Sequence, residues 1–177
     1  MRSADLTPVA RDVMRLPATG GVIFFSFVAA LALSAFEWTG GWLLVRPDFA
    51  LLVLLFWAIH EPRSIGQGVA FALGLMMDVS DSTLLGQHAL AYVIAVYGAQ
   101  VLRVRIFSFG LLEQTLHVLG LAVLASVVML VLNLLLGADF PGLAYFLGPA
   151  ITALAWAPTT LVLHSQAVRR RRSEAAS

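Results

Sequence analysis

The chain has 177 residues, of which 60% are apolar and 12% are charged, and its mean hydropathy is +0.90. A soluble domain of about 150 residues still exposes about a third of the surface of its unfolded chain, so this composition excludes an ordinary soluble protein and favours one embedded in lipid. The formal charge is +1, every basic residue is an arginine, and there is no cysteine, which excludes disulfides, thiolate metal sites and cysteine nucleophiles.

The hydrophobic runs predict one all-α membrane domain of about six transmembrane helices, because a helix needs about 20 apolar residues to cross the hydrocarbon core. In chain order the predicted helices cover residues 20–36, 42–59, 64–77, 84–102, 111–136 and 142–168. The second and third could be two full spans or a shallow hairpin bent at Glu61-Pro62-Arg63. Pro149 and Pro158 should bend the sixth helix.

The first hydrophobic run begins only near Gly20, and no small-residue cleavage site follows it. We therefore expect a retained helix and not a signal peptide. The predicted organisation is a cytoplasmic segment over residues 1–19, a six-helix membrane domain over residues 20–168 and a basic cytoplasmic tail over residues 169–177.

The arginines are distributed unevenly and predict how the chain is oriented. Basic residues accumulate in short cytoplasmic loops. With six spans and both termini in the cytoplasm, every arginine except Arg46 lies on the cytoplasmic side. If the second and third helices formed an outer hairpin, Arg63 would join Arg46 outside.

Two acids, Asp78 and Asp81, lie in the short outer loop predicted between the third and fourth helices. The structural interpretation is that Asp81 or Ser82 caps the fourth helix, because a side-chain oxygen there can accept hydrogen bonds from the first exposed amides. Asp78 would then end the third helix in the headgroup layer.

The functional interpretation of the same stretch is a polar pocket that opens outward. Gln87 and His88 lie one turn further in and need polar partners, since an unpaired polar group in lipid costs several kcal/mol. Ionisable groups within a membrane are candidates for function. The predicted binding residues, in an outward pocket or at a contact with a partner, are Arg46, Asp48, Asp78, Gln87 and His88.

Small residues recur every four positions along the third helix, at Gly66, Ala70 and Gly74. Such a stripe lets helix backbones approach closely in lipid, so these three residues are predicted to pack another helix. The stripe continues to Asp78, so the same neighbouring helix should lie beside that carboxylate.

Polar residues also mark the start of the fifth helix. Glu113 and His117 are four apart and share a face, and Arg103 and Arg105 precede them in the inner loop. The residues predict a charge network at the inner surface or, alternatively, a docking site for a cytoplasmic protein.

The motifs of common enzymes are missing. His60-Glu61 has no second histidine four residues after the first, so the zinc-protease pattern is absent. No serine lies in a Gly-x-Ser-x-Gly turn, there is no phosphate-binding loop, and Asp78 with His88 supplies only two ligands for a metal. We expect no enzymatic activity, no metal, no cofactor and no nucleic-acid partner. What remains is a membrane-embedded binding or scaffold protein, or a carrier of small solutes.

Residues 46–90 resemble the rod shape-determining protein MreD family of Gram-negative bacteria. The pattern is an Arg-Pro before a leucine-rich helix, an aromatic near its end, a later proline, a Gly-x-Gly opening the next helix, a Gly and an Asp closing it, and a Leu-Gly with an Ala-Leu starting the next. Here these positions are Arg46, Pro47, Trp57, Pro62, Gly66, Gly68, Gly74, Asp78, Leu85, Gly86, Ala89 and Leu90.

The resemblance implies a function that the residue chemistry alone does not reach. It implies a non-enzymatic scaffold of the elongasome, the complex that builds the side-wall peptidoglycan of rod-shaped cells, in the bacterial inner membrane. The implied partners are MreC, then RodA and its penicillin-binding transpeptidase, MreB indirectly, and membrane lipid.

The resemblance also implies a fold similar to the substrate-binding subunits of vitamin importers, with six helices around an outward-facing cavity. That fold supplies an alternative function, the substrate-binding subunit of a small-solute importer. The two differ in their partners, since a carrier needs an energising module and a scaffold needs MreC.

Overall fold

The protein is all-helical wherever its structure is described. A computed structural model describes residues 20–35, 46–108 and 110–163, and within them there is no β-strand. These residues form six α-helices and one short 3-10 helix. In chain order they are α1 (Gly20–Ser34), α2 (Phe49–His60), α3 (Gln67–Ser80), α4 (Gln87–Ser108), α5 (Leu111–Leu135), η2 (Leu143–Phe146) and α6 (Leu147–Leu154). After a turn at Ala155, residues 156–163 are helical again. The predicted all-α fold of six helices is confirmed for this part of the chain.

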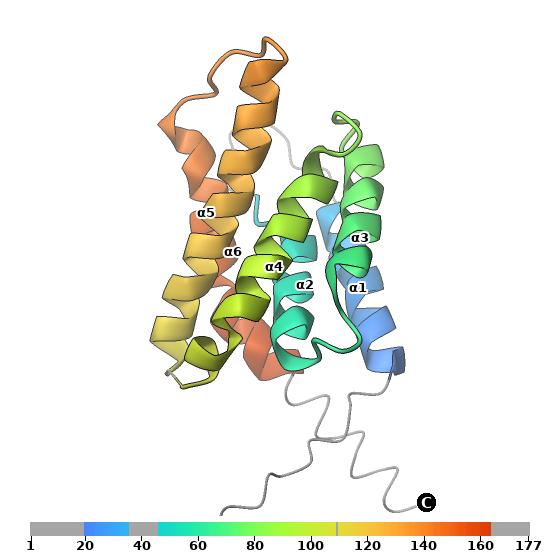
Figure 1. The fold of residues 1–177 in the computed structure, drawn as a ribbon, viewed down its shortest axis with the longest axis vertical. Helices are drawn as coiled ribbons and strands as arrows, with labels where there is room; N and C mark the ends of the chain where they lie inside the picture. The colour runs from blue at the N-terminus through green and yellow to red at the C-terminus, as the bar shows by residue number, and fades with distance from the viewer. Residues whose placement is uncertain (1–19, 36–45, 109, 164–177) are drawn as a thin grey trace, which may run out of the picture.

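The helices form an up-and-down bundle (Figure 1). α3 packs mainly on α4, α4 on α5, and α5 on α6, while α1 packs on α2. The α2–α3 and α4–α5 connections lie at one end of the bundle, and the α3–α4 and α5–η2 connections lie at the other (Figure 1).

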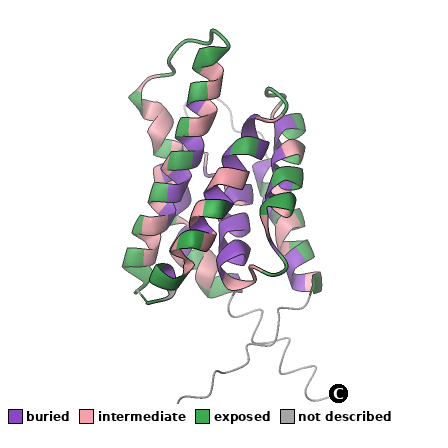
Figure 2. Ribbon diagram, viewed as in Figure 1, coloured by how far each residue is buried: buried purple, intermediate pink, exposed green. Residues whose placement is uncertain are grey.

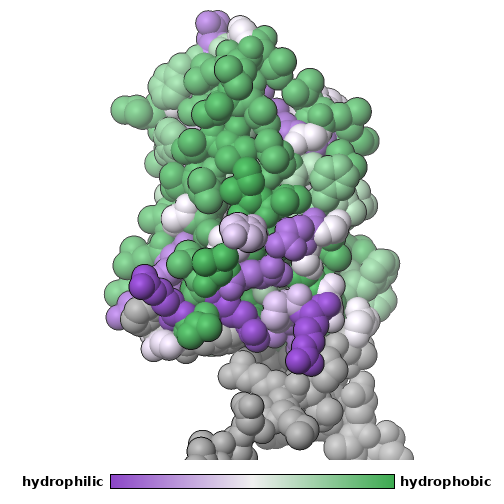
Figure 3. Space-filling model, in the orientation of Figure 1, coloured by the Kyte–Doolittle hydropathy of each residue, from purple (hydrophilic) through white to green (hydrophobic). Residues whose placement is uncertain are grey.

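Three stretches are long and apolar enough to cross a membrane, Gln87–Ile106, Leu111–Leu135 and Leu143–Leu163. The remaining helices are shorter but also apolar. Large apolar side chains such as Phe24, Leu112 and Leu135 are more than half exposed. Figure 3 shows hydrophobic side chains over the upper part of one face and hydrophilic ones gathered near its lower end. An apolar outer surface of this extent is the arrangement that lipid favours.

α2 is the central helix of the bundle. Every residue from Ala50 to Ile59 is buried, and the ribbon of α2 is continuously buried in Figure 2. Its 12 residues rise only about 18 Å, at about 1.5 Å each, whereas the hydrocarbon core is about 30 Å thick. The predicted second helix over residues 42–59 was therefore too long at its start: residues 46–48 are not helical, and residues 42–45 lie outside the described part.

α3 and α4 meet at Gly74. A Cβ atom at that position would lie 2.4 Å from the Cα atom of Ala89, a backbone atom that cannot move aside. Of the other two small residues predicted to pack a helix, Ala70 is fully buried. Gly66 is the N-cap of α3, and a Cβ there would meet nothing within 4 Å.

The described arginines lie at both ends of α2. Arg63 follows α2, and the Nε–H of Arg103 donates to the carbonyl of Ile59 at 2.7 Å, near the same end. Arg46 precedes α2. Arg105 lies in the last turn of α4, and the other arginines used to predict the orientation, in residues 1–19 and 164–177, lie outside the described residues.

Candidate functional site

A cavity of about 320 Å³ lies at the N-terminal end of α2. It exists because the central helix α2 begins part-way along the bundle, while α4 and α5 extend beyond that level (Figure 1). Its apolar wall includes Leu51, Met77, Met129 and Pro149. Its polar wall consists of Arg46, Asp48, Asp81, His88, Ser126, Tyr145 and Thr152. A mostly apolar pocket with a few converging polar groups is a typical ligand or partner site.

Asp48 connects three helices at the floor of the cavity. Its Oδ1 atom accepts the Leu51 N–H at 2.8 Å, which caps α2. The Tyr92 hydroxyl of α4 lies 2.8 Å from each carboxylate oxygen, and the Asp48 N–H donates to Thr152 Oγ1 of α6 at 2.8 Å.

Asp78 caps α4 from the end of α3. Its side chain is fully buried, and it accepts the backbone N–H of Gly86 at 2.7 Å and of His88 at 2.8 Å. The Nδ1–H of His88 donates to the same carboxylate at 2.9 Å. Gly86 has a φ of 99°, a conformation that glycine adopts without steric cost.

This arrangement corrects the capping interpretation. The prediction that Asp81 or Ser82 caps the fourth helix is wrong, because Asp78 already accepts the amides at its start. Asp81 instead pairs with Arg46 at 3.0 Å, with both side chains 21% exposed. That pair connects the residues before α2 with the end of α3.

The structure places three of the five predicted binding residues on the cavity wall: Arg46, Asp48 and His88. Asp78 contacts the Nδ1 atom of His88, and Gln87 is buried at the start of α4. Neither lines the cavity.

Sequence reasoning did not identify the other polar wall residues as site residues. Asp81 was interpreted only as a cap. Ser126, Tyr145 and Thr152 lie on helices distant in sequence, and no local pattern distinguishes them from packing residues. The Tyr145 hydroxyl donates to the Ser126 carbonyl at 3.0 Å, a contact that only the folded bundle creates.

Glu113 caps its own helix. Its carboxylate accepts the Gly110 N–H at 3.0 Å, and His117 Nδ1 lies 2.7 Å from the Glu113 carbonyl. Within the described residues no ion pair joins Glu113 to Arg103 or Arg105, and the charge network at the inner surface stays a prediction. In the same part of the chain no three histidine, aspartate or glutamate side chains gather as a metal site would require.

A second cavity, of about 360 Å³, lies between α1, α2 and residues 158–163. Its lining is almost entirely apolar, with Phe25, Leu52 and Val162 among the largest side chains. None of its described lining residues is ionisable, so the cavity at the end of α2 is the candidate site.

Comparison with known proteins gives one family and one relative. The model of the rod shape-determining protein MreD family matches residues 18–162. The rod shape-determining protein MreD of Haemophilus influenzae is 35% identical over 71 residues, which cover 40% of this chain and 44% of that protein. The match therefore spans less than half the length of the relative. No solved structure matches the chain.

Proposed function

The chain belongs to the rod shape-determining protein MreD family, and from that premise we propose that it is a non-enzymatic membrane scaffold of the elongasome. The resemblance inferred from residues 46–90 is confirmed, and membership implies a role in determining rod shape. We propose that it acts with MreC in side-wall peptidoglycan synthesis, near RodA and its penicillin-binding transpeptidase, with MreB reached indirectly.

The observation that carries the proposal is the family match over most of the described bundle. The structure supports a scaffold because its acids hold helices together. Asp48 connects α2 with α4 and α6, Asp78 connects α3 with α4, and Asp81 pairs with Arg46. Groups engaged in this way build a rigid surface for binding.

The proposed location is the bacterial inner membrane, with both termini in the cytoplasm. The apolar helices support a membrane protein. The hydrophilic end that carries Arg63, Arg103 and Arg105 would face the cytoplasm by the positive-inside rule, which would place Arg46 and the cavity towards the outer side.

The test depletes this protein from its own cells and measures where new cell wall is made. Labelled wall precursors should no longer enter the side wall, cells should become round, and septal labelling should continue. Re-expression should restore the rods. Continued side-wall labelling with a loss of uptake of one solute would contradict the scaffold.

The alternative is a substrate-binding subunit of a small-solute importer, with a fold like that of the vitamin-importer subunits. The cavity at the end of α2 favours it, because discontinuous or short helices ending inside a bundle often mark transporter sites. A carrier would accompany an ATPase pair and a membrane coupling subunit, so the identity of the partners separates the two functions.

A further inference from the structure

Two carboxylate oxygens on the polar wall of the cavity could each accept a further hydrogen bond. Asp48 Oδ2 shares the single Tyr92 hydroxyl with Oδ1. Asp81 gives Oδ1 to Arg46, while its Oδ2 lies 4.0 Å from His88 Nε2, outside hydrogen-bond distance. Both spare oxygens belong to residues that line the cavity.

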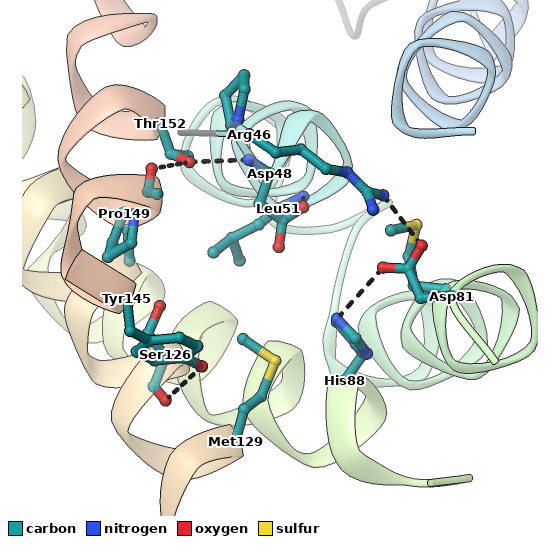
Figure 4. A pocket seen from close by; sticks show the side chains of 14 residues that line it. Arg46, Asp48, Leu51, Asp81, His88, Ser126, Met129, Tyr145, Pro149 and Thr152 are labelled. Atoms are coloured by element: carbon teal, nitrogen blue, oxygen red, sulfur yellow. Dashed lines mark hydrogen bonds and ion pairs between the residues drawn. The ribbon is translucent and has the colours of Figure 1, made fainter. Parts of the chain in front are cut away.

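His88 lies between Asp78 and the acids of the cavity wall. A carboxylate only accepts hydrogen bonds, so the contact between His88 Nδ1 and Asp78 at 2.9 Å places the ring proton on Nδ1. The His88 Nε2 atom lies on the cavity side of the ring, 4.0 Å from Asp81 Oδ2. His88 is 8% exposed, and its ring points from α4 towards Asp81 at the cavity (Figure 4).

Positive charge is scarce on this wall. Arg46 is the one basic residue among the described lining residues, and its guanidinium is already paired with Asp81. Asp48 and Asp81 face the same space, so an incoming anion would meet acceptors, while an incoming cation would meet complementary partners.

The rest of the lining suits a cation that carries a short hydrocarbon chain, called its stem below. Tyr145 contributes an aromatic ring, which attracts cations over its face, and its hydroxyl is occupied by the Ser126 carbonyl. Leu51, Met77 and Met129 are apolar and would cover a short hydrocarbon chain.

We propose that this cavity binds a primary ammonium or guanidinium group carried on an apolar stem. The group donates to Asp48 Oδ2 and Asp81 Oδ2, and the stem packs against the methionines and Leu51. This site goes beyond the scaffold role and does not depend on which proteins accompany the chain. A lipid headgroup amine and a lysine or arginine side chain of a partner share this chemistry.

Small probes test the chemistry directly. The purified full chain in lipid nanodiscs is titrated with n-butylammonium, n-butylguanidinium, n-butanol and butyrate, with binding followed by ligand-observed NMR. The two cations should bind saturably and at least about tenfold more tightly than the alcohol, because charge-assisted hydrogen bonds add to the shared apolar contact. Equal affinities, or tighter binding of butyrate, would overturn the proposal.

One variant tests whether the probe binds in this cavity, and it removes no helix-capping side chain. Asp81→Asn should weaken butylammonium binding about tenfold while keeping the melting temperature close to that of the parent. The matched control is Asp139→Asn, since Asp139 is exposed on the connection after α5 and outside the cavity lining. Unchanged affinity in Asp81→Asn would refute this site as the position of the cation.

The source of the cation is found by crosslinking in native membranes. A photoreactive benzoylphenylalanine replaces Met129, which lines the cavity, and the adduct is identified by mass spectrometry. An aminolipid adduct assigns the headgroup, and a peptide with a lysine or arginine at the crosslink assigns a protein. Adducts that carry no cationic group would overturn the proposal.

Discussion

Asp78 shows how one side chain replaces a local cap. It lies ten positions before His88 along the chain, yet its carboxylate accepts the His88 N–H, the His88 ring N–H and the Gly86 N–H. The sequence indicated that an acid here would cap a helix or belong to a pocket. It could not select Asp78 over Asp81, because that choice depends on the distance between the end of α3 and the start of α4.

The two acids should therefore differ when each is removed. Asp78→Ala leaves buried backbone amides without a hydrogen-bond partner, at a cost of about 1–3 kcal/mol for each unsatisfied group. The variant should therefore be less stable, and cells that depend on it should lose their rod shape. Asp81→Ala breaks a partly exposed pair worth about 1 kcal/mol or less. Thermal unfolding in detergent and cell shape after complementation are the measurements. Equal behaviour of both variants would contradict the cap that the structure assigns to Asp78.

The contribution of the Tyr92 hydroxyl to the free energy of unfolding should also be measurable. Tyr92→Phe keeps the ring and removes the hydrogen bond to Asp48, so stability should fall by about 1.5–3 kcal/mol, as for a bond to a charged group. Tyr97→Phe is the control on the same helix, because Tyr97 is 62% exposed. Similar unfolding curves for the two variants would show that the Asp48 contact contributes little.

At the scale of helices, hydropathy predicted that six elements exist and where most of them lie. It did not predict that α2 begins only at Phe49, because the predicted helix was continued through Arg46-Pro47-Asp48, although a proline and a capping aspartate there mark a helix start. It also could not show that α2 is enclosed by other helices, because a helix that is apolar on all sides suits either environment. The cavity follows from these two facts, so its far wall, Tyr145 and Thr152, had no signal in the sequence.

The contact between α3 and α4 predicts opposite effects for two glycines. Gly74→Ala would push a methyl group into the Ala89 backbone and should separate the helices, at a cost of about 1–3 kcal/mol or more. Gly68→Ala, on the same helix with open space around it, should be neutral or stabilising by up to about 1 kcal/mol.

Unfolding of both variants in one detergent measures the difference, and the larger Gly74→Leu should also lower the recovery of MreC. If Gly74→Ala is as stable as Gly68→Ala, the close approach of α3 to α4 is refuted.

At the scale of the whole molecule, the bundle has a hydrophilic end with Arg63 and Arg103 and a cavity towards the opposite end. The arginine distribution predicted which end would face the cytoplasm. The structure shows two ends of different character, but orientation is a property of the protein in its membrane and stays a prediction.

The absence of cysteine makes this orientation simple to measure. Ser64→Cys, in the α2–α3 connection, and Asp139→Cys, after α5, are both at exposed positions. In intact spheroplasts a membrane-impermeant thiol reagent should label Asp139→Cys, and it should label Ser64→Cys only after the membrane is opened. Labelling of Ser64→Cys from outside would mean that α2 and α3 form an outer hairpin.

The identity of the proteins that accompany this chain in its own membrane tests the scaffold most directly. Membranes are crosslinked gently and extracted in mild detergent, and the proteins that remain bound are identified by mass spectrometry. A scaffold of the elongasome should be recovered with MreC, together with RodA and its transpeptidase. Recovery of an ATPase pair with a membrane coupling subunit, and no MreC, would contradict the scaffold and identify a carrier.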